Sequence, residues 1–134
     1  MIAVDTSVLV AAFAAWHEAH ELATAALSRR PRLPAHVLLE TFSVLTRLPP
    51  PHRAPGELVD AFFEEHLRQA PLTLPASEQR ALVSTAVKAG IAGGAIYDAL
   101  VAATAKHAGA TLLSRDRRAL ITYELVGVRY EMLG

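Results

Sequence analysis

Apolar residues follow two different periods along this chain, and the two periods alternate. Strand-like segments occupy residues 1–4, 32–35, 71–74, 110–113 and 126–133, and the first of them is the continuous apolar run typical of a buried parallel strand. Between them, apolar positions recur at helical spacing over 7–15, 17–28, 37–48, 57–70, 77–88 and 95–107, and one or two short helices are expected over 116–125. This order predicts an α/β fold in which helices flank a parallel sheet.

The length suits one domain. With 134 residues, 52% of them hydrophobic and 19% charged, the chain is long enough for one buried core and too short for two ordinary domains, so residues 1–134 are expected to form a single domain. The chain has no cysteine, which excludes disulfides, thiolate zinc sites and cysteine nucleophiles. That composition suits a reducing compartment.

Neither the hydropathy nor the net charge of the chain indicates a membrane or a nucleic acid as its partner. No apolar run reaches the roughly 20 residues of a membrane span, and no leader of secretory type begins the chain. We therefore expect a cytoplasmic protein without membrane contact. Thirteen basic and thirteen acidic residues cancel, so any binding of nucleic acid depends on a local patch.

Four acidic residues occupy positions that suit a binding site better than a solvated surface. Asp5 and Asp116 follow strand-like runs, and ligands of open parallel sheets bind beyond the carboxyl ends of the strands. Glu40 and Asp98 interrupt apolar helix faces, and Asp98 has no cation three or four residues later. Carboxylates gathered in one pocket repel one another unless cations compensate them, and oxygen ligands favour Mg²⁺ or Mn²⁺ over zinc. The pattern predicts a metal-dependent hydrolase of phosphate esters.

Each of these acids also has a structural alternative. Asp5 and Asp116 could simply cap the helices that follow them, and Glu40 could pair with an arginine. Asp98 could be a structural acid, although an unpaired carboxylate on such an apolar face would cost several kcal/mol or shift its pKa.

Other motifs are weaker. Residues 17–21 lack the zinc-binding His-Glu-x-x-His pattern because position 21 is glutamate, and the glycines at 90–94 are not followed by the lysine of a phosphate-binding loop. Trp16 is expected in the core or at an interface rather than as a base-stacking platform.

Several segments together carry a family resemblance. They are Val-Asp-Thr-Ser at 4–7, Glu40 early in a helix, Gly-Ile-Ala-Gly-Gly-Ala-Ile-Tyr-Asp-Ala-Leu at 90–100 and Leu-Leu-Ser-Arg-Asp at 112–116. In these residues and their spacing, the whole chain resembles the PIN-domain ribonucleases, specifically the VapC-type toxins of toxin–antitoxin pairs. The resemblance implies a single PIN-like domain with a central five-stranded parallel sheet flanked by helices.

The resemblance also implies an active site. Asp5, Glu40, Asp98 and Asp116 would form an acidic pocket that binds Mg²⁺ or Mn²⁺ and hydrolyses RNA phosphodiester bonds. Asp5 and Asp98 would be the principal ligands of a first metal, while Glu40 and Asp116 would complete the site, bind a second metal or position the water.

Hydroxyl groups would orient these acids, and guanidinium groups would contact the RNA. Ser114 would orient a metal-bound water or an acid, and Thr6 or Ser7 would play a comparable role near Asp5. The candidates for contact with the RNA backbone are Arg115, Arg117 and Arg118, with an ordinary solvated turn as the alternative.

The resemblance finally implies partners. An RNA substrate, a cognate VapB-type antitoxin and a homodimer are expected. The alternative function is that of a catalytically silent PIN-like module that binds RNA or protein and whose acids serve only structure.

Overall fold

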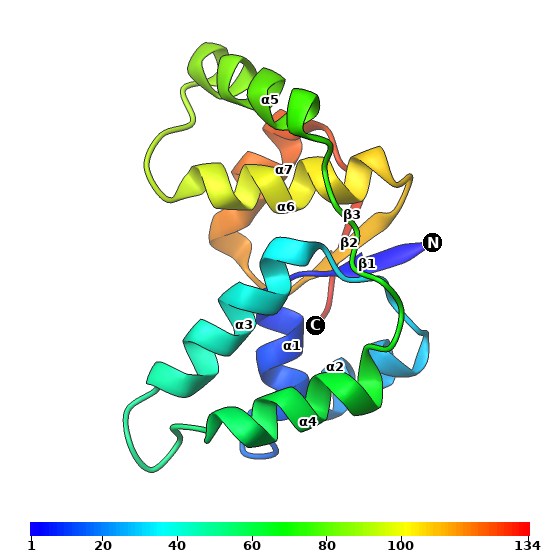
Figure 1. The fold of residues 1–134 in the computed structure, drawn as a ribbon, viewed down its shortest axis with the longest axis vertical. Coiled ribbons are helices and arrows are strands. Elements are labelled where there is room, and N and C mark those ends of the chain that lie inside the picture. Colours follow the sequence, from blue (N-terminus) through cyan, green and yellow to red (C-terminus); the bar gives the residue numbers. More distant parts are fainter.

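A small parallel sheet forms the centre of the molecule in the computed structural model, which describes residues 1–134 (Figure 1). Strands β1 (Ile2–Val4), β2 (Thr111–Ser114) and β3 (Tyr130–Met132) are hydrogen-bonded in that order, and both pairs are parallel. The predicted α/β class with a parallel sheet and flanking helices is confirmed. Because parallel strands end at the same edge, the residues that follow β1 and β2 lie together.

The sheet has three regular strands where five were expected. The second expected strand makes one parallel bridge to β1, Arg32 with Ala3, and one to the third expected strand, Pro34 with Leu72. A proline lies within or beside each of these segments, and proline has no amide proton to donate to a ladder. These segments therefore extend the sheet beyond β1 through single bridges rather than as full strands.

The helices surround this sheet and account for most of the chain. Their bounds are α1 (Thr6–Phe13), α2 (His20–Ser28), α3 (Ala35–Arg47), α4 (Gly56–His66), α5 (Ala76–Ala89), α6 (Ala95–His107), the 3₁₀ helix η1 (Arg117–Ala119) and α7 (Leu120–Val126). Helices α3, α4 and α5 begin directly after a proline, whose fixed φ angle and missing amide proton suit a helix start.

Several predicted boundaries are wrong. The helix expected from residue 17 begins at His20, because the His17 ring accepts a hydrogen bond from the Ala19 amide at 3.0 Å and so holds a turn there. The last strand begins only at Tyr130, because α7 continues to Val126 and ends at Gly127 in the left-handed conformation, with φ 86°.

The main core joins the sheet to α1, α2, α3, α6 and α7. Its fully buried side chains include Val4, Leu9, Leu112, Leu113 and Tyr123. Figure 1 shows α5, α6 and α7 at one end of the molecule and α1 to α4 at the other, with the sheet between them. No helix combines the length and the apolar character that crossing a membrane requires.

Candidate functional site

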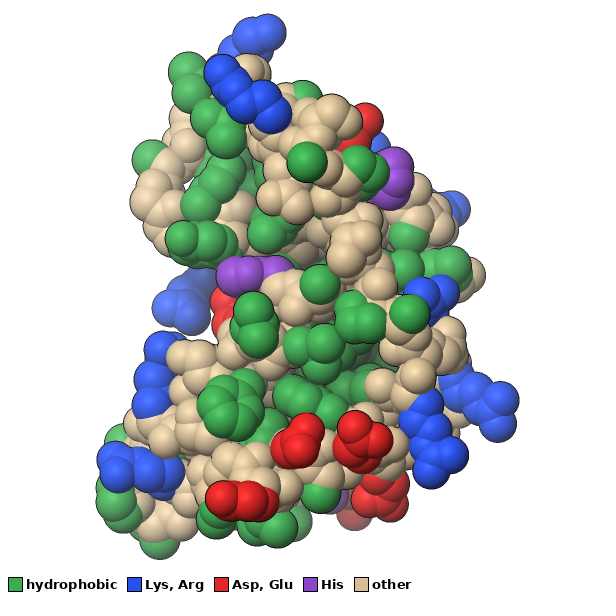
Figure 2. Space-filling view, in the orientation of Figure 1, with side chains coloured by type: hydrophobic (Ala, Val, Ile, Leu, Met, Phe, Trp, Pro, Cys, Tyr) green, Lys and Arg blue, Asp and Glu red, His purple; other side chains and the backbone are tan.

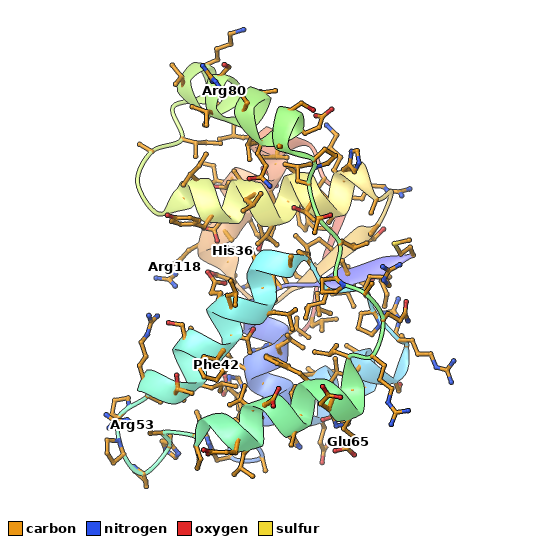
Figure 3. All side chains as sticks on the ribbon, in the orientation of Figure 1. His36, Phe42, Arg53, Glu65, Arg80 and Arg118 are labelled. Carbon is orange, nitrogen blue, oxygen red and sulfur yellow. The ribbon has the colours of Figure 1, made fainter.

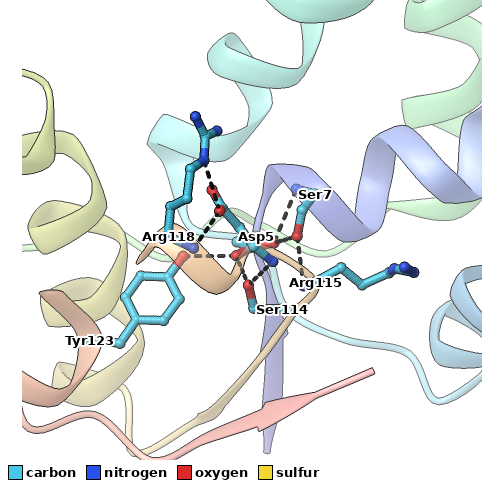
Figure 4. Close-up of polar contacts among 7 residues, drawn as sticks. Asp5, Ser7, Ser114, Arg115, Arg118 and Tyr123 are labelled. Atoms are coloured by element: carbon cyan, nitrogen blue, oxygen red, sulfur yellow. Dashed lines mark hydrogen bonds and ion pairs between the residues drawn. The ribbon is translucent and has the colours of Figure 1, made fainter. Parts of the chain in front are cut away.

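Asp5 lies directly after β1 and is almost completely buried, with 4% of its surface exposed. Its Oδ1 accepts hydrogen bonds from the Ser7 amide (3.0 Å) and the Ser7 hydroxyl, and its Oδ2 accepts from the hydroxyls of Ser114 and Tyr123 (2.7 Å for Tyr123; Figure 4). A carboxylate has about four acceptor sites, so these four bonds use its capacity. Burial raises the pKa of Asp5, and the hydrogen bonds oppose that rise.

The two serines connect Asp5 to the loop after β2. The Ser7 hydroxyl accepts a hydrogen bond from the Arg115 amide at 2.8 Å, and the Ser114 hydroxyl accepts one from the Asp116 amide at 3.0 Å. Both serines therefore hold the loop that carries the fourth acid against the end of β1. This is the position at which hydroxyl groups were expected to orient the acids.

Asp116 lies at the edge of the same loop and is partly exposed. Its Oδ1 accepts from the Arg118 amide at 3.0 Å and lies 3.5 Å from the Arg118 Nε. Asp5 and Asp116 thus each cap the helix that follows, as the structural alternative proposed. Asp5 and Asp116 can cap these helices and still belong to the site, because both lie at the same edge of the sheet, after β1 and β2.

Glu40 and Asp98 approach this edge from helices α3 and α6. The Oε1 of Glu40 accepts a hydrogen bond from the Thr6 hydroxyl, and its Oε2 lies 3.7 Å from the His36 Nε2. Glu40 therefore pairs with a histidine rather than with an arginine. Asp98, in the first turn of α6, makes no ion pair, as its sequence neighbours predicted.

The charges of the four acids affect one another. The pKa of Asp98 is raised to about 6, first by burial and then by the carboxylates of Glu40, Asp116 and Asp5, against a smaller lowering by Arg118. The fold has therefore brought four carboxylates from four distant parts of the sequence within electrostatic range.

A cleft of about 550 Å³ opens beside these residues. Its lining comprises Thr6, Ser7, Val10, His17, Glu18, Glu40, Val44, Arg47, Asp98, Arg115, Asp116 and Arg118. Three of the four predicted acids face the cleft, and Asp5 lies behind them. Arg115 and Arg118 line it, whereas Arg117 is exposed outside it; Figure 3 shows Arg118 beside the gap between α3 and α6.

The oxygen donors of this cleft are of the kind that binds a divalent cation, but the acidic side chains lie too far apart to hold one. Carboxylate and hydroxyl oxygens are the ligands that Mg²⁺ and Mn²⁺ prefer, and the repulsion that raises the pKa of Asp98 is what a cation offsets. No three acidic or histidine side chains converge closely enough to hold a metal ion. Glu40, Asp98 and Asp116, which line the cleft, and Asp5 behind them are the residues that would hold such an ion.

Sequence reasoning missed two residues of the site. The Tyr123 hydroxyl donates to Asp5 from 118 residues away, and no local pattern indicates such a contact. His36 lies four residues before Glu40 on α3, a spacing that could have suggested the pair. Its ring also stacks on Tyr97, with centroids 5.1 Å apart and planes at 4°.

Known proteins match the chain along nearly its full length. The PIN domain family matches residues 2–125. Ribonuclease VapC40 of Mycobacterium tuberculosis (strain ATCC 25618 / H37Rv) is 52% identical over 133 residues, which cover 99% of this chain and 99% of the relative. Ribonuclease VapC27 of the same strain is 42% identical over 129 residues, which cover 95% of this chain and 93% of the relative.

Proposed function

This chain belongs to the PIN-domain family, and from that premise we propose that it is an endoribonuclease, the VapC-type toxin of a VapB–VapC toxin–antitoxin pair, with Mg²⁺ or Mn²⁺ as cofactor. The single observation that carries the catalytic assignment is the gathering of Glu40, Asp98 and Asp116 around one cleft with Asp5 buried behind them, and with the pKa of Asp98 raised to about 6. Such perturbed carboxylates in a cleft are typical of functional sites.

Glu40, Asp98, Asp116 and Asp5 would hold the cation. When bound, a divalent cation supplies neutralisation of the substrate phosphate and a more acidic water. The hydroxyl of Thr6 donates a hydrogen bond that orients the Glu40 carboxylate, and the ring of His36 lies beside it.

The arginines of the cleft suit the substrate. Arg47, Arg115 and Arg118 line it, and guanidinium groups bind phosphate oxygens through paired hydrogen bonds. Arg115 has no carboxylate partner. No ion pair within the protein would therefore compete with an RNA phosphate for its charge.

The experiment that tests this function combines acid-to-amide variants with metal control. Purified protein should cleave RNA with Mg²⁺ or Mn²⁺ and lose that activity in EDTA, and Asp5→Asn and Asp98→Asn should each lose it while remaining folded. Asp60→Asn, an exposed acid on α4, is the matched control and should cleave like the wild type. Cleavage in EDTA, or by Asp98→Asn, would overturn the metal site, and RNA binding without any cleavage would favour a silent binding module.

The partners form part of the same proposal. We expect the protein to act in the cytoplasm, as a homodimer that binds a VapB-type antitoxin. Co-expression with the neighbouring antitoxin gene should yield a stable complex with suppressed ribonuclease activity. A monomer that purifies alone from that operon would contradict this assignment of partners.

A further inference from the structure

Two aromatic rings pack against each other, tilted, on the surface where the loops after α1 and α3 meet. The centroids of Trp16 and His52 lie 4.1 Å apart, with the ring planes at 31°. Trp16 is 52% exposed and His52 is exposed as well, so Trp16 lies outside the core, and of the two places expected for it only an interface is left. The pair leaves a large aromatic surface in water without contributing to the core.

This aromatic pair lies beside one end of the acidic cleft. His17, the residue after Trp16, lines the cleft, and so does Arg47 in the last turn of α3. Helix α3 carries the cleft outward from Glu40 to Arg47, about 10 Å of helix, and His52 follows in the next loop. A nucleic-acid strand in the cleft would therefore reach the two rings within a few nucleotides.

The positive charges near Trp16 and His52 also suit a nucleic-acid strand. Neither Arg47 nor Arg53 forms an ion pair with a carboxylate. Arg53 lies on the edge of the molecule that also carries Arg118 (Figure 3), and basic side chains follow this edge in the space-filling view (Figure 2). Arginines beside exposed aromatic rings are the combination with which proteins bind single-stranded nucleic acid.

The loop that carries His52 is restricted in conformation. Residues 49, 50, 51 and 55 are prolines, and each fixes its own φ angle. Little loop entropy would then be lost when a ligand binds.

A second ring pair, His36 stacked on Tyr97, is less available to a ligand, because His36 already contacts the Glu40 carboxylate.

We propose that Trp16 and His52 form a stacking platform for an unpaired base of the RNA substrate, with Arg47 and Arg53 contacting the flanking phosphates. This inference rests on the proposed ribonuclease function and specifies its substrate as single-stranded RNA near the cleavage point. Every base presents an aromatic face, so the platform would bind without strong sequence preference.

The chain offers a direct assay because Trp16 is its only tryptophan. In EDTA, to prevent cleavage, a short single-stranded RNA should quench the fluorescence of Trp16 saturably, whereas the matching RNA duplex and inorganic polyphosphate should not. Anisotropy of a labelled RNA should show roughly fivefold or more weaker binding for Trp16→Ala and His52→Ala. Trp16→Phe, which keeps an aromatic ring, should bind nearly as well as the wild type.

The matched control is Val87→Ala, which removes an apolar side chain that is 76% exposed on the distant helix α5; its RNA binding should not change. If Trp16→Ala binds RNA with the affinity of the wild type, or if polyphosphate quenches Trp16 as much as single-stranded RNA does, the platform is refuted. A fluorescence change that depends on protein concentration alone would also refute it, because it would indicate a protein interface. RNA that binds with quenching but is never cleaved in Mg²⁺ would instead refute the ribonuclease assignment and leave the platform intact.

Discussion

Replacing Asp98 by asparagine should abolish RNA cleavage and yet stabilise the protein without metal. The substitution removes one negative charge and little volume from a partly buried position. The rise in the pKa of Asp98 from 3.8 to about 6 corresponds to about 3 kcal/mol against the ionised form. Because Asp98 is only partly buried, screening by solvent reduces the expected gain to about 1–2 kcal/mol.

The direction of the pH dependence follows from the same pKa. An acid whose pKa is higher in the folded state keeps its proton longer than it does in the unfolded chain, so stability falls as the pH rises from about 4 to about 6. Above that range the full penalty applies to the wild type. Asp98→Asn carries no such penalty, so the difference in free energy of unfolding should be largest above pH 7 and should disappear near pH 4.

Urea unfolding in EDTA at several pH values measures this difference. Asp98→Asn should also raise the melting temperature at pH 7.5 by about 3–8 °C, whereas the control Asp60→Asn should change it little. Added Mg²⁺ should stabilise the wild type more than Asp98→Asn, because a ligand that binds only the folded state stabilises it more the tighter it binds. If Asp98→Asn is no more stable than the wild type above pH 7 in EDTA, the four carboxylates do not repel one another as inferred.

Three further predictions concern the surroundings of the acids. Tyr123→Phe should lower the free energy of unfolding by about 1–3 kcal/mol, since it removes a buried donor to Asp5; unchanged urea unfolding would show that this bond adds nothing. Ser114→Ala should reduce single-turnover cleavage about tenfold at unchanged RNA affinity, because Asp5 loses a donor, and full activity would contradict that role. Arg118→Gln should weaken RNA binding and lower its salt dependence more than Arg117→Gln does, because only Arg118 lines the cleft; equal effects in a salt titration would refute the assignment.

Much of the fold could be predicted because secondary structure leaves a local periodic signal. The apolar spacing placed the helix over 95–107 at the bounds that the structure has. Strands were harder, since a short apolar run does not reveal whether its neighbour will pair along its length. The proline-containing segments around Arg32 and Leu72 were expected as strands, yet they make only single bridges.

The site divides in the same way. The sequence alone determined which acids were out of place on a solvated surface, because burial of a helix face or the end of a strand shows in the nearest few residues. Only the tertiary structure decided that Asp5 lies behind the cleft with donors from Ser114 and Tyr123, that Thr6 donates to Glu40, and that Trp16 packs on His52 outside the core. These contacts join distant segments, and their geometry depends on strand order and helix packing, which no local pattern of residues encodes.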